Sequence, residues 1–130
     1  MLRTKVRFTL VLIIFVVMIK SNECRIGNWV DDRWTNSRRR LTLQDFAREH
    51  KDQDFFNQIR PIYFTSEVLE KCGFENKDGE YKLPDFYPPC YFEGGKLFVA
   101  FGEYRTSLKY LHQLQNLYFA HMDEELKVEL

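Results

Sequence analysis

Two aromatic-rich stretches separated by a pair of glycines constrain the fold of this chain more than any other feature. Residues 90–101 are Cys-Tyr-Phe-Glu-Gly-Gly-Lys-Leu-Phe-Val-Ala-Phe, and both flanks are rich in residues that favour β-structure. Gly94 and Gly95 can supply the positive φ angles that a tight hairpin turn requires. The sequence therefore predicts an antiparallel hairpin here, preceded by a short strand over residues 80–83 that Pro84 ends.

A long amphipathic helix is predicted after this hairpin, from Ser107 to about Met122. Its wide apolar face is made by Tyr110, Leu111, Leu114, Leu117 and Tyr118. A polar stripe at i, i+3, i+4 and i+7 is made by Lys109, His112, Gln113 and Asn116. We expect the apolar face to lie on a sheet. The stripe is either the solvated side of the helix or a binding surface for a protein partner.

Shorter elements complete the predicted fold. A helix over residues 41–51 has Thr42 as its N-cap and Asp45 in an approximate capping box, with Leu43, Phe46 and Ala47 on one face. The other predicted elements are a strand at 25–30, a polar loop or hairpin at 31–40, an extended segment at 59–64 and a final strand at 126–130. A short helix is also predicted at 67–72, with Thr65 or Ser66 as its cap and Gly73 as its end. The fold class is thus α+β: a small single domain with a mainly antiparallel sheet and a long C-terminal helix packed on it.

The first residues differ in composition from the rest of the chain. The protein has 19 basic and 19 acidic side chains, yet the only charges in residues 1–17 are three basic ones, and residues 8–19 contain one polar residue. This apolar run is shorter than the roughly 17–25 residues of a transmembrane helix. It suits a signal peptide, but no small-x-small cleavage site follows it. The other interpretation is an upstream mis-start, with Met18 as the true first residue and 18–130 as the folded domain.

No pattern in the sequence predicts catalysis or a cofactor. The three cysteines are odd in number and lack a CxxC spacing, which favours free thiols in the cytoplasm over a secreted disulfide framework. The three histidines lack metal-ligand spacing, and the chain contains no GxSxG, P-loop or GxGxxG motif. We therefore predict no catalytic residues, no cofactor and no metal, although an enzyme stays open as an alternative.

A basic segment near the front of the domain predicts a second kind of contact. Residues 25–40 hold five arginines and two tryptophans against two aspartates. Arginine pairs with phosphates and tryptophan stacks on bases. The candidate nucleic-acid contacts are Trp34, Arg38, Arg39 and Arg40, and the alternative is a solubilising loop beside a core tryptophan.

Three segments resemble an uncharacterised family of small proteins from gut-type bacteria, their phages and mobile elements. They are Arg25–Val30 (RIGNWV), residues 59–74 (IRPI, FTSE and CGF within them), and Lys109–Ala120 (KYLHQLQNLYFA) with Glu124-Glu125-Leu126 after it. His121-Met122-Asp123 departs from the Leu-Thr-Gly of the family pattern, and residues 31–58 match no part of it.

The resemblance implies a cytoplasmic protein of unknown activity that starts a few residues before Arg25, which favours Met18 as the start. Three functional hypotheses follow. The first is a non-catalytic binding or adaptor domain of a phage or mobile element, with a protein partner. The second is a membrane-anchored or exported domain that uses residues 1–19. The third is a nucleic-acid-contacting protein that uses residues 25–40.

Overall fold

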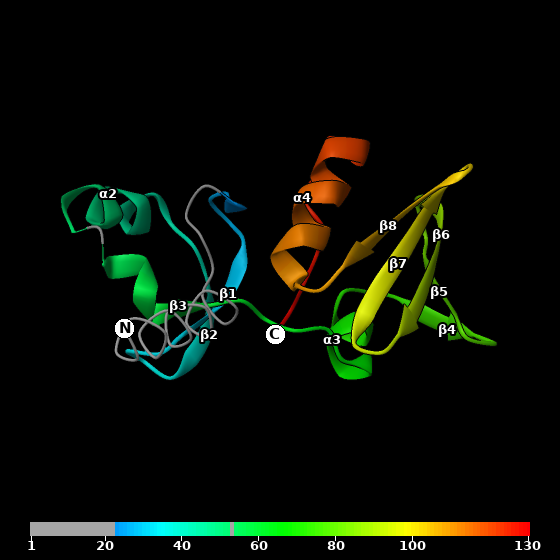
Figure 1. The fold of residues 1–130 in the computed structure, drawn as a ribbon, viewed down its shortest axis with the longest axis horizontal. Coiled ribbons are helices and arrows are strands. Elements are labelled where there is room, and N and C mark those ends of the chain that lie inside the picture. The colour runs from blue at the N-terminus through cyan, green and yellow to red at the C-terminus, as the bar shows by residue number, and fades with distance from the viewer. Residues whose placement is uncertain (1–22, 53) are drawn as a thin grey trace, which may run out of the picture. The chain divides into compact units, whose positions relative to one another are not determined.

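The protein is a small α+β domain with two antiparallel sheets and a C-terminal helix, as predicted (Figure 1). The computed structural model describes residues 23–52 and 54–130. Within the chain, residues up to Pro61 and residues from Ile62 onward form two compact units, here called unit 1 and unit 2. The interpretations of residues 1–17, and the start of the 18–130 domain, fall outside the described residues.

Unit 1 contains a small sheet in the order β2-β1-β3. Residues 31–40, for which a loop and a hairpin were both open, form a hairpin in which Trp29 pairs with Arg40 and Asp32 with Ser37. Val30, Leu41, Phe56 and Ile59 form the buried core of this unit. Its elements are β1 (Trp29–Asp32), β2 (Ser37–Arg40), α2 (Leu43–Lys51), the 3-10 turn η2 (Phe55–Gln58) and β3 (Ile59–Arg60).

Helix α2 begins as predicted. Thr42 is its N-cap, and the Asp45 carboxylate accepts a hydrogen bond from the Thr42 backbone N–H at 2.6 Å. The predicted apolar face is wrong in part, because Leu43 and Ala47 are exposed and Phe46 is half-buried against the unit 1 core. Asp45, not an apolar residue, is the buried residue of this helix.

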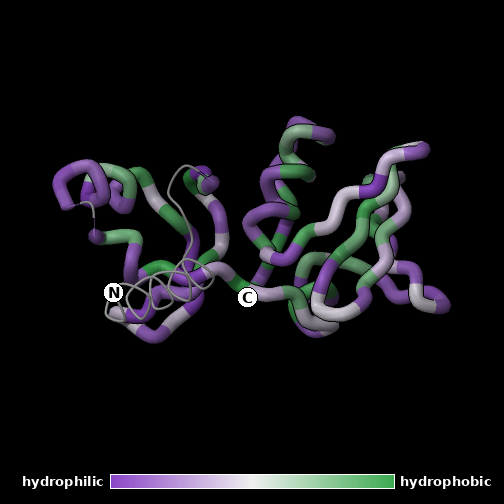
Figure 2. The backbone as a smooth tube through the Cα atoms, in the orientation of Figure 1, coloured by the Kyte–Doolittle hydropathy of each residue, from purple (hydrophilic) through white to green (hydrophobic). Residues whose placement is uncertain are grey.

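Unit 2 contains a five-stranded antiparallel meander in the order β4-β5-β6-β7-β8. The predicted hairpin is confirmed: Gly94 and Gly95 both have positive φ, and Glu93 pairs with Lys96 across them. Figure 2 shows the hydrophobic run through β7, whose Leu97 and Val99 are fully buried. The strands are β4 (Glu75–Lys77), β5 (Glu80–Leu83), β6 (Phe86–Glu93), β7 (Lys96–Phe101) and β8 (Tyr104–Leu108).

Helix α3 (Ser66–Lys71) has the ends that its sequence predicts. The Thr65 side chain accepts a hydrogen bond from the Val68 N–H at 3.1 Å. At the other end, Gly73 has a φ of +94°, its N–H bonds to the Glu70 carbonyl, and the Phe74 N–H bonds to the Leu69 carbonyl. This pair of bonds is a Schellman motif, which explains why glycine stands at this position.

The C-terminal helix α4 (Leu111–Met122) packs on the sheet as predicted, through ring contacts of Phe86 with Tyr118 and His121 at 5.6 and 5.5 Å. Its predicted start at Ser107 is wrong, because Gly102 (φ +59°) turns the chain and Ser107 pairs with Phe98 as part of β8. The predicted strand at 126–130 is also wrong. Leu126 and Val128 are buried, but this segment joins neither sheet.

Candidate functional site

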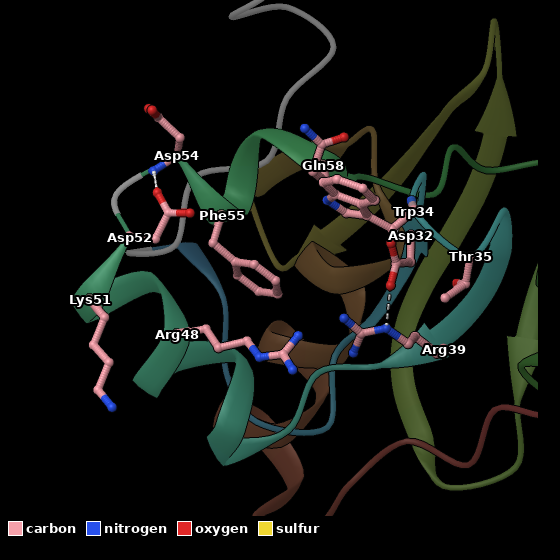
Figure 3. Close-up of a pocket in the computed structure, with 10 residues that line it drawn as sticks. All are labelled: Asp32, Trp34, Thr35, Arg39, Arg48, Lys51, Asp52, Asp54, Phe55 and Gln58. Carbon is pink, nitrogen blue, oxygen red and sulfur yellow. Dashed lines mark hydrogen bonds and ion pairs between the residues drawn. The ribbon is translucent and has the colours of Figure 1, made fainter.

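A hollow of about 730 Å³ lies beside the β1–β2 hairpin in unit 1 and is the candidate site. Trp34 stands at the hairpin tip with 74% of its surface exposed, and Phe55 lines the hollow from η2. Figure 3 shows the side chains of Arg39 and Arg48 extending into this region from β2 and α2. The other residues that line it are Asp32, Thr35, Lys51, Asp52, Asp54 and Gln58.

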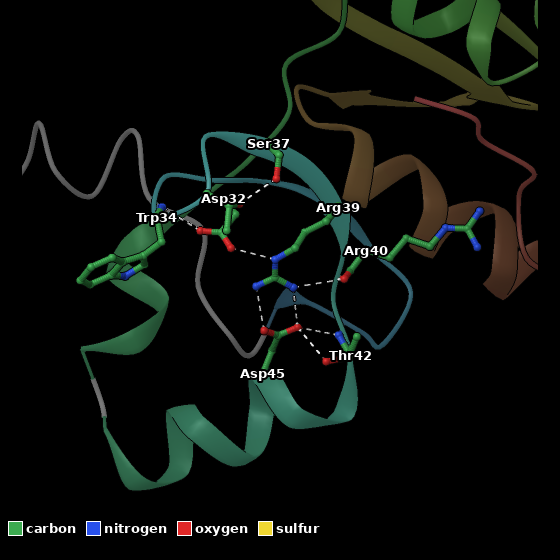
Figure 4. A network of polar contacts seen from close by, with 8 residues as sticks. Asp32, Trp34, Ser37, Arg39, Arg40, Thr42 and Asp45 are labelled. Carbon is green, nitrogen blue, oxygen red and sulfur yellow. Dashed lines mark hydrogen bonds and ion pairs between the residues drawn. The ribbon is translucent and has the colours of Figure 1, made fainter.

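One wall of the hollow is a network of ion pairs centred on Arg39 (Figure 4). The Arg39 Nε donates to Asp32 at 2.8 Å, and both terminal nitrogens donate to the two Asp45 oxygens at 2.8 Å each. The Asp32 carboxylate also accepts a hydrogen bond from the Trp34 backbone N–H at 2.8 Å. The network therefore ties the hairpin, its exposed Trp34 and the start of α2 together.

The charge state of this network is fixed across the neutral range. Burial by itself would raise the pKa of Asp32 and of Asp45, but the hydrogen bonds from Arg39 and from backbone N–H groups outweigh it, and both pKa values lie below the usual range. The hydrogen bonds that Arg39 donates to Asp45 and Asp32 raise the pKa of Arg39 further above its already high usual value. All three groups are thus ionised near pH 7.

The structure separates the four residues predicted to contact nucleic acid. Trp34 and Arg39 line the hollow, but the guanidinium of Arg39 is already bound to two carboxylates. Arg38 pairs with Asp31 at 3.3 Å, and Arg40 lies over the Trp29 ring at 5.3 Å, as cross-strand neighbours on the hairpin. Only Trp34 therefore offers the predicted kind of contact without giving up an internal partner.

Sequence reasoning missed two cations and an aromatic ring at this site. Arg48 lies over the Phe55 ring at 5.8 Å, and neither Arg48 nor Lys51 forms an ion pair with any residue in 23–52 or 54–130. Both sit in the last turn of α2, where cations are favourable. Their spacing of three residues was visible in the sequence, but nothing there placed Trp34 beside them.

The predicted polar stripe on the C-terminal helix does not form one exposed surface. His112 is buried, with 1% of its surface exposed, and its ring stacks on that of Tyr110. The Gln113 side chain closes the start of α4 by accepting from the backbone N–H groups of Lys109 and Tyr110 at 2.9 and 3.1 Å. Asn116 is half-buried. The stripe is therefore partly a capping device and partly core.

Among residues 23–52 and 54–130, the remaining cysteine, histidine and acidic side chains do not converge on a site. Burial raises the pKa of each of the three free thiols, Cys24, Cys72 and Cys90, to about 12, which makes them poor nucleophiles. In the described residues, no group of three or more histidine, cysteine or acidic side chains is placed to hold a metal ion. No helix among them has both the length and the hydropathy of a membrane span.

Comparison of the chain with protein-family models, with curated proteins and with solved structures finds no match. The resemblance of residues 25–30, 59–74 and 109–126 to a family of small bacterial and phage proteins therefore stays a prediction.

Proposed function

We propose that the protein is a non-catalytic binding or adaptor protein, and that the Trp34 hollow of unit 1 holds a segment of a protein partner. The observation that carries this proposal is the exposed Trp34 beside a hollow that also holds Phe55 and two cations, Arg48 and Lys51, with no ion pair among the described residues. Tryptophan and arginine are the residue types most enriched at the energetic centres of protein interfaces. Following the resemblance, we place the protein in the cytoplasm and in a phage or mobile element.

Preorganisation supports this assignment. The Trp34 backbone is held by Asp32, which is itself held by Arg39 and through it by Asp45. A side chain on a fixed hairpin loses less conformational entropy on binding than one on a loose loop. The hairpin thus presents its aromatic side chain at low entropic cost.

The charges around the hollow favour a protein over a nucleic acid. Residues 23–61, which contain the described part of unit 1, hold eight basic and seven acidic side chains, so this surface offers little net attraction for a polyanion. Asp52 and Asp54 line the hollow together with Arg48 and Lys51. We expect the bound segment to carry an apolar or aromatic side chain against Trp34 and Phe55 and an acidic side chain beside Arg48 and Lys51.

The test is selection of a random displayed-peptide library on the full chain. We expect enriched peptides that share an apolar residue next to an acidic one, and we expect Trp34→Ala to weaken their binding by a factor of about 30 or more, the cost of a hot-spot truncation. Tyr104→Ala is the matched control, because Tyr104 is an equally exposed aromatic residue on β8 of unit 2.

Labelled single-stranded oligonucleotides, titrated at several salt concentrations, form the second arm. Oligonucleotide binding that is lost in both Trp34→Ala and Arg48→Ala, with no peptide selected, would replace the protein partner with a nucleic acid. Peptide binding that Trp34→Ala leaves unchanged would refute the hollow as the site.

A further inference from the structure

The outer face of the unit 2 sheet carries aromatic side chains where an antiparallel sheet facing water normally carries polar ones. Strand β6 alternates cleanly, with Phe86 and Cys90 buried and Tyr87 and Tyr91 exposed. On β7, Leu97 and Val99 are buried, so Phe98 and Ala100 belong to the outer face, where Phe98 is directly opposite Tyr91. The centre of this exposed face is therefore apolar.

Two opposite charges lie at the two ends of this apolar centre. Glu93 is at the β6–β7 turn, where it pairs with Lys96. Arg105 lies on β8 opposite Ala100, which is four residues along β7 from Lys96. Both side chains line the same shallow hollow of about 400 Å³ with Tyr91, Phe98 and Ala100. Neither forms an ion pair within the described residues, and Glu93 makes none with Lys96, its neighbour across the turn.

This arrangement is complementary to itself. A two-fold axis in the plane of the interface, at right angles to the line from Glu93 to Arg105, leaves the aromatic centre facing its own copy. The same operation places Glu93 of one chain over Arg105 of the other, and the reverse. We propose that two copies of this chain associate face to face through the outer surface of the unit 2 sheet, with Tyr91 and Phe98 at the centre and two Glu93–Arg105 pairs at the rim.

The size of the surface sets the expected strength. The patch spans only three strands, which lie about 4.8 Å apart. Its area is therefore smaller than the roughly 800 Å² that each partner buries in a standard stable interface. The dimer is accordingly weak, with a dissociation constant on the order of micromolar or above. It assembles only at high concentration, or when a partner bound to unit 1 brings two copies together.

Charge reversal tests the pairing directly. Sedimentation velocity over a range of concentrations gives the dimer dissociation constant of the full chain. Glu93→Arg and Arg105→Glu each place like charges in both pairs, and each is expected to raise that constant about tenfold or more. The double variant Glu93→Arg/Arg105→Glu restores opposite charges in both pairs and is expected to return the constant to within a few-fold of wild type.

Two controls separate the interface from changes in net charge and folding. Glu70→Arg makes the same charge change on the exposed surface of α3 and is expected to leave the dimer unchanged. Phe98→Ser is expected to abolish the dimer, and its far-UV circular dichroism reports whether the sheet persists. A chain that stays monomeric at all concentrations overturns the proposal, as does a double reversal that dimerises no better than the single ones.

Discussion

Replacing His112 is expected to remove a specific part of the pH dependence of stability. This imidazole has 1% of its surface exposed, and burial lowers its pKa from the ordinary 6.5 to about 4. The folded state therefore holds His112 neutral at a pH where the unfolded chain protonates it. Because the unfolded state then binds more protons, the free energy of unfolding falls as the pH drops through this window.

The magnitude follows from the size of the shift. Each pKa unit corresponds to about 1.4 kcal/mol, so the full difference of about 2.5 units is worth about 3 kcal/mol, fully lost below about pH 4. At about pH 4.5 most of it, roughly 2.5 kcal/mol, has already gone relative to pH 7. In a domain whose total stability is about 5–15 kcal/mol, this is a large change.

The assay is urea unfolding followed by far-UV circular dichroism between about pH 7 and pH 4.5. His112→Gln removes the titrating group, so the wild type is expected to lose roughly 2.5 kcal/mol more than this variant over that range. The matched control is His50→Gln, because His50 is exposed on α2 and its replacement should leave the wild-type slope unchanged. Parallel pH profiles for the wild type and His112→Gln would refute the assignment of a buried neutral imidazole.

Three further outcomes are expected. Asp45→Ala removes the Asp45 half of the α2 capping box and the paired acceptor of Arg39, and should lower the free energy of unfolding of unit 1 by about 2 kcal/mol in urea melts. Asp31→Ala breaks an exposed pair and should cost less than about 0.5 kcal/mol. Gly73→Ala should lower the free energy of unfolding by about 1 kcal/mol in the same melts, because alanine disfavours the positive φ at this position. The added Cβ would meet Leu83 at an ordinary contact distance of 3.6 Å, so no steric clash adds to this cost, and an unchanged midpoint would contradict the prediction. Reaction of Cys72 and Cys90, the two buried thiols, with a thiol reagent should be slow in the folded protein and fast in urea. Fast modification of either one in the folded protein, located by peptide mass spectrometry, would contradict this.

Local signals predicted much of the fold because each acts over a few residues. The Gly94-Gly95 turn, the Thr42 and Thr65 caps and the Gly73 helix end depend on neighbours within about five positions, and the structure confirms all of them.

The wrong predictions occur where a residue distant in sequence determines the local structure. Ser107 is a good helix N-cap by type, but pairing with Phe98 on β7 makes it part of a strand. Residues 126–130 alternate between apolar and polar side chains, as a strand does, but they are part of neither sheet.

The candidate site was harder to predict than the fold, because a count of charges does not reveal how they pair. Residues 25–40 contain five arginines, which suggests a surface for phosphates. Asp45 lies outside that segment, and only the return of α2 against the hairpin brings its carboxylate to Arg39. The signal for Arg48 was likewise hidden, since its contact with Phe55 crosses from α2 to η2.

The ion pairs of Arg39 change the interpretation of the basic segment, residues 25–40. A guanidinium held at 2.8 Å by two carboxylates would have to leave both to bind a phosphate, and removing one partner of such a pair leaves a poorly solvated charge behind. The same bonds fix the position of Asp32, and Asp32 fixes the backbone of Trp34. In the proposed binding site, Arg39 thus acts through Trp34: it holds the backbone of an exposed aromatic side chain and is not expected to contact the bound segment itself. By that reasoning, the residues that we propose to recognise a partner are Trp34 of this segment and the cations Arg48 and Lys51 of α2.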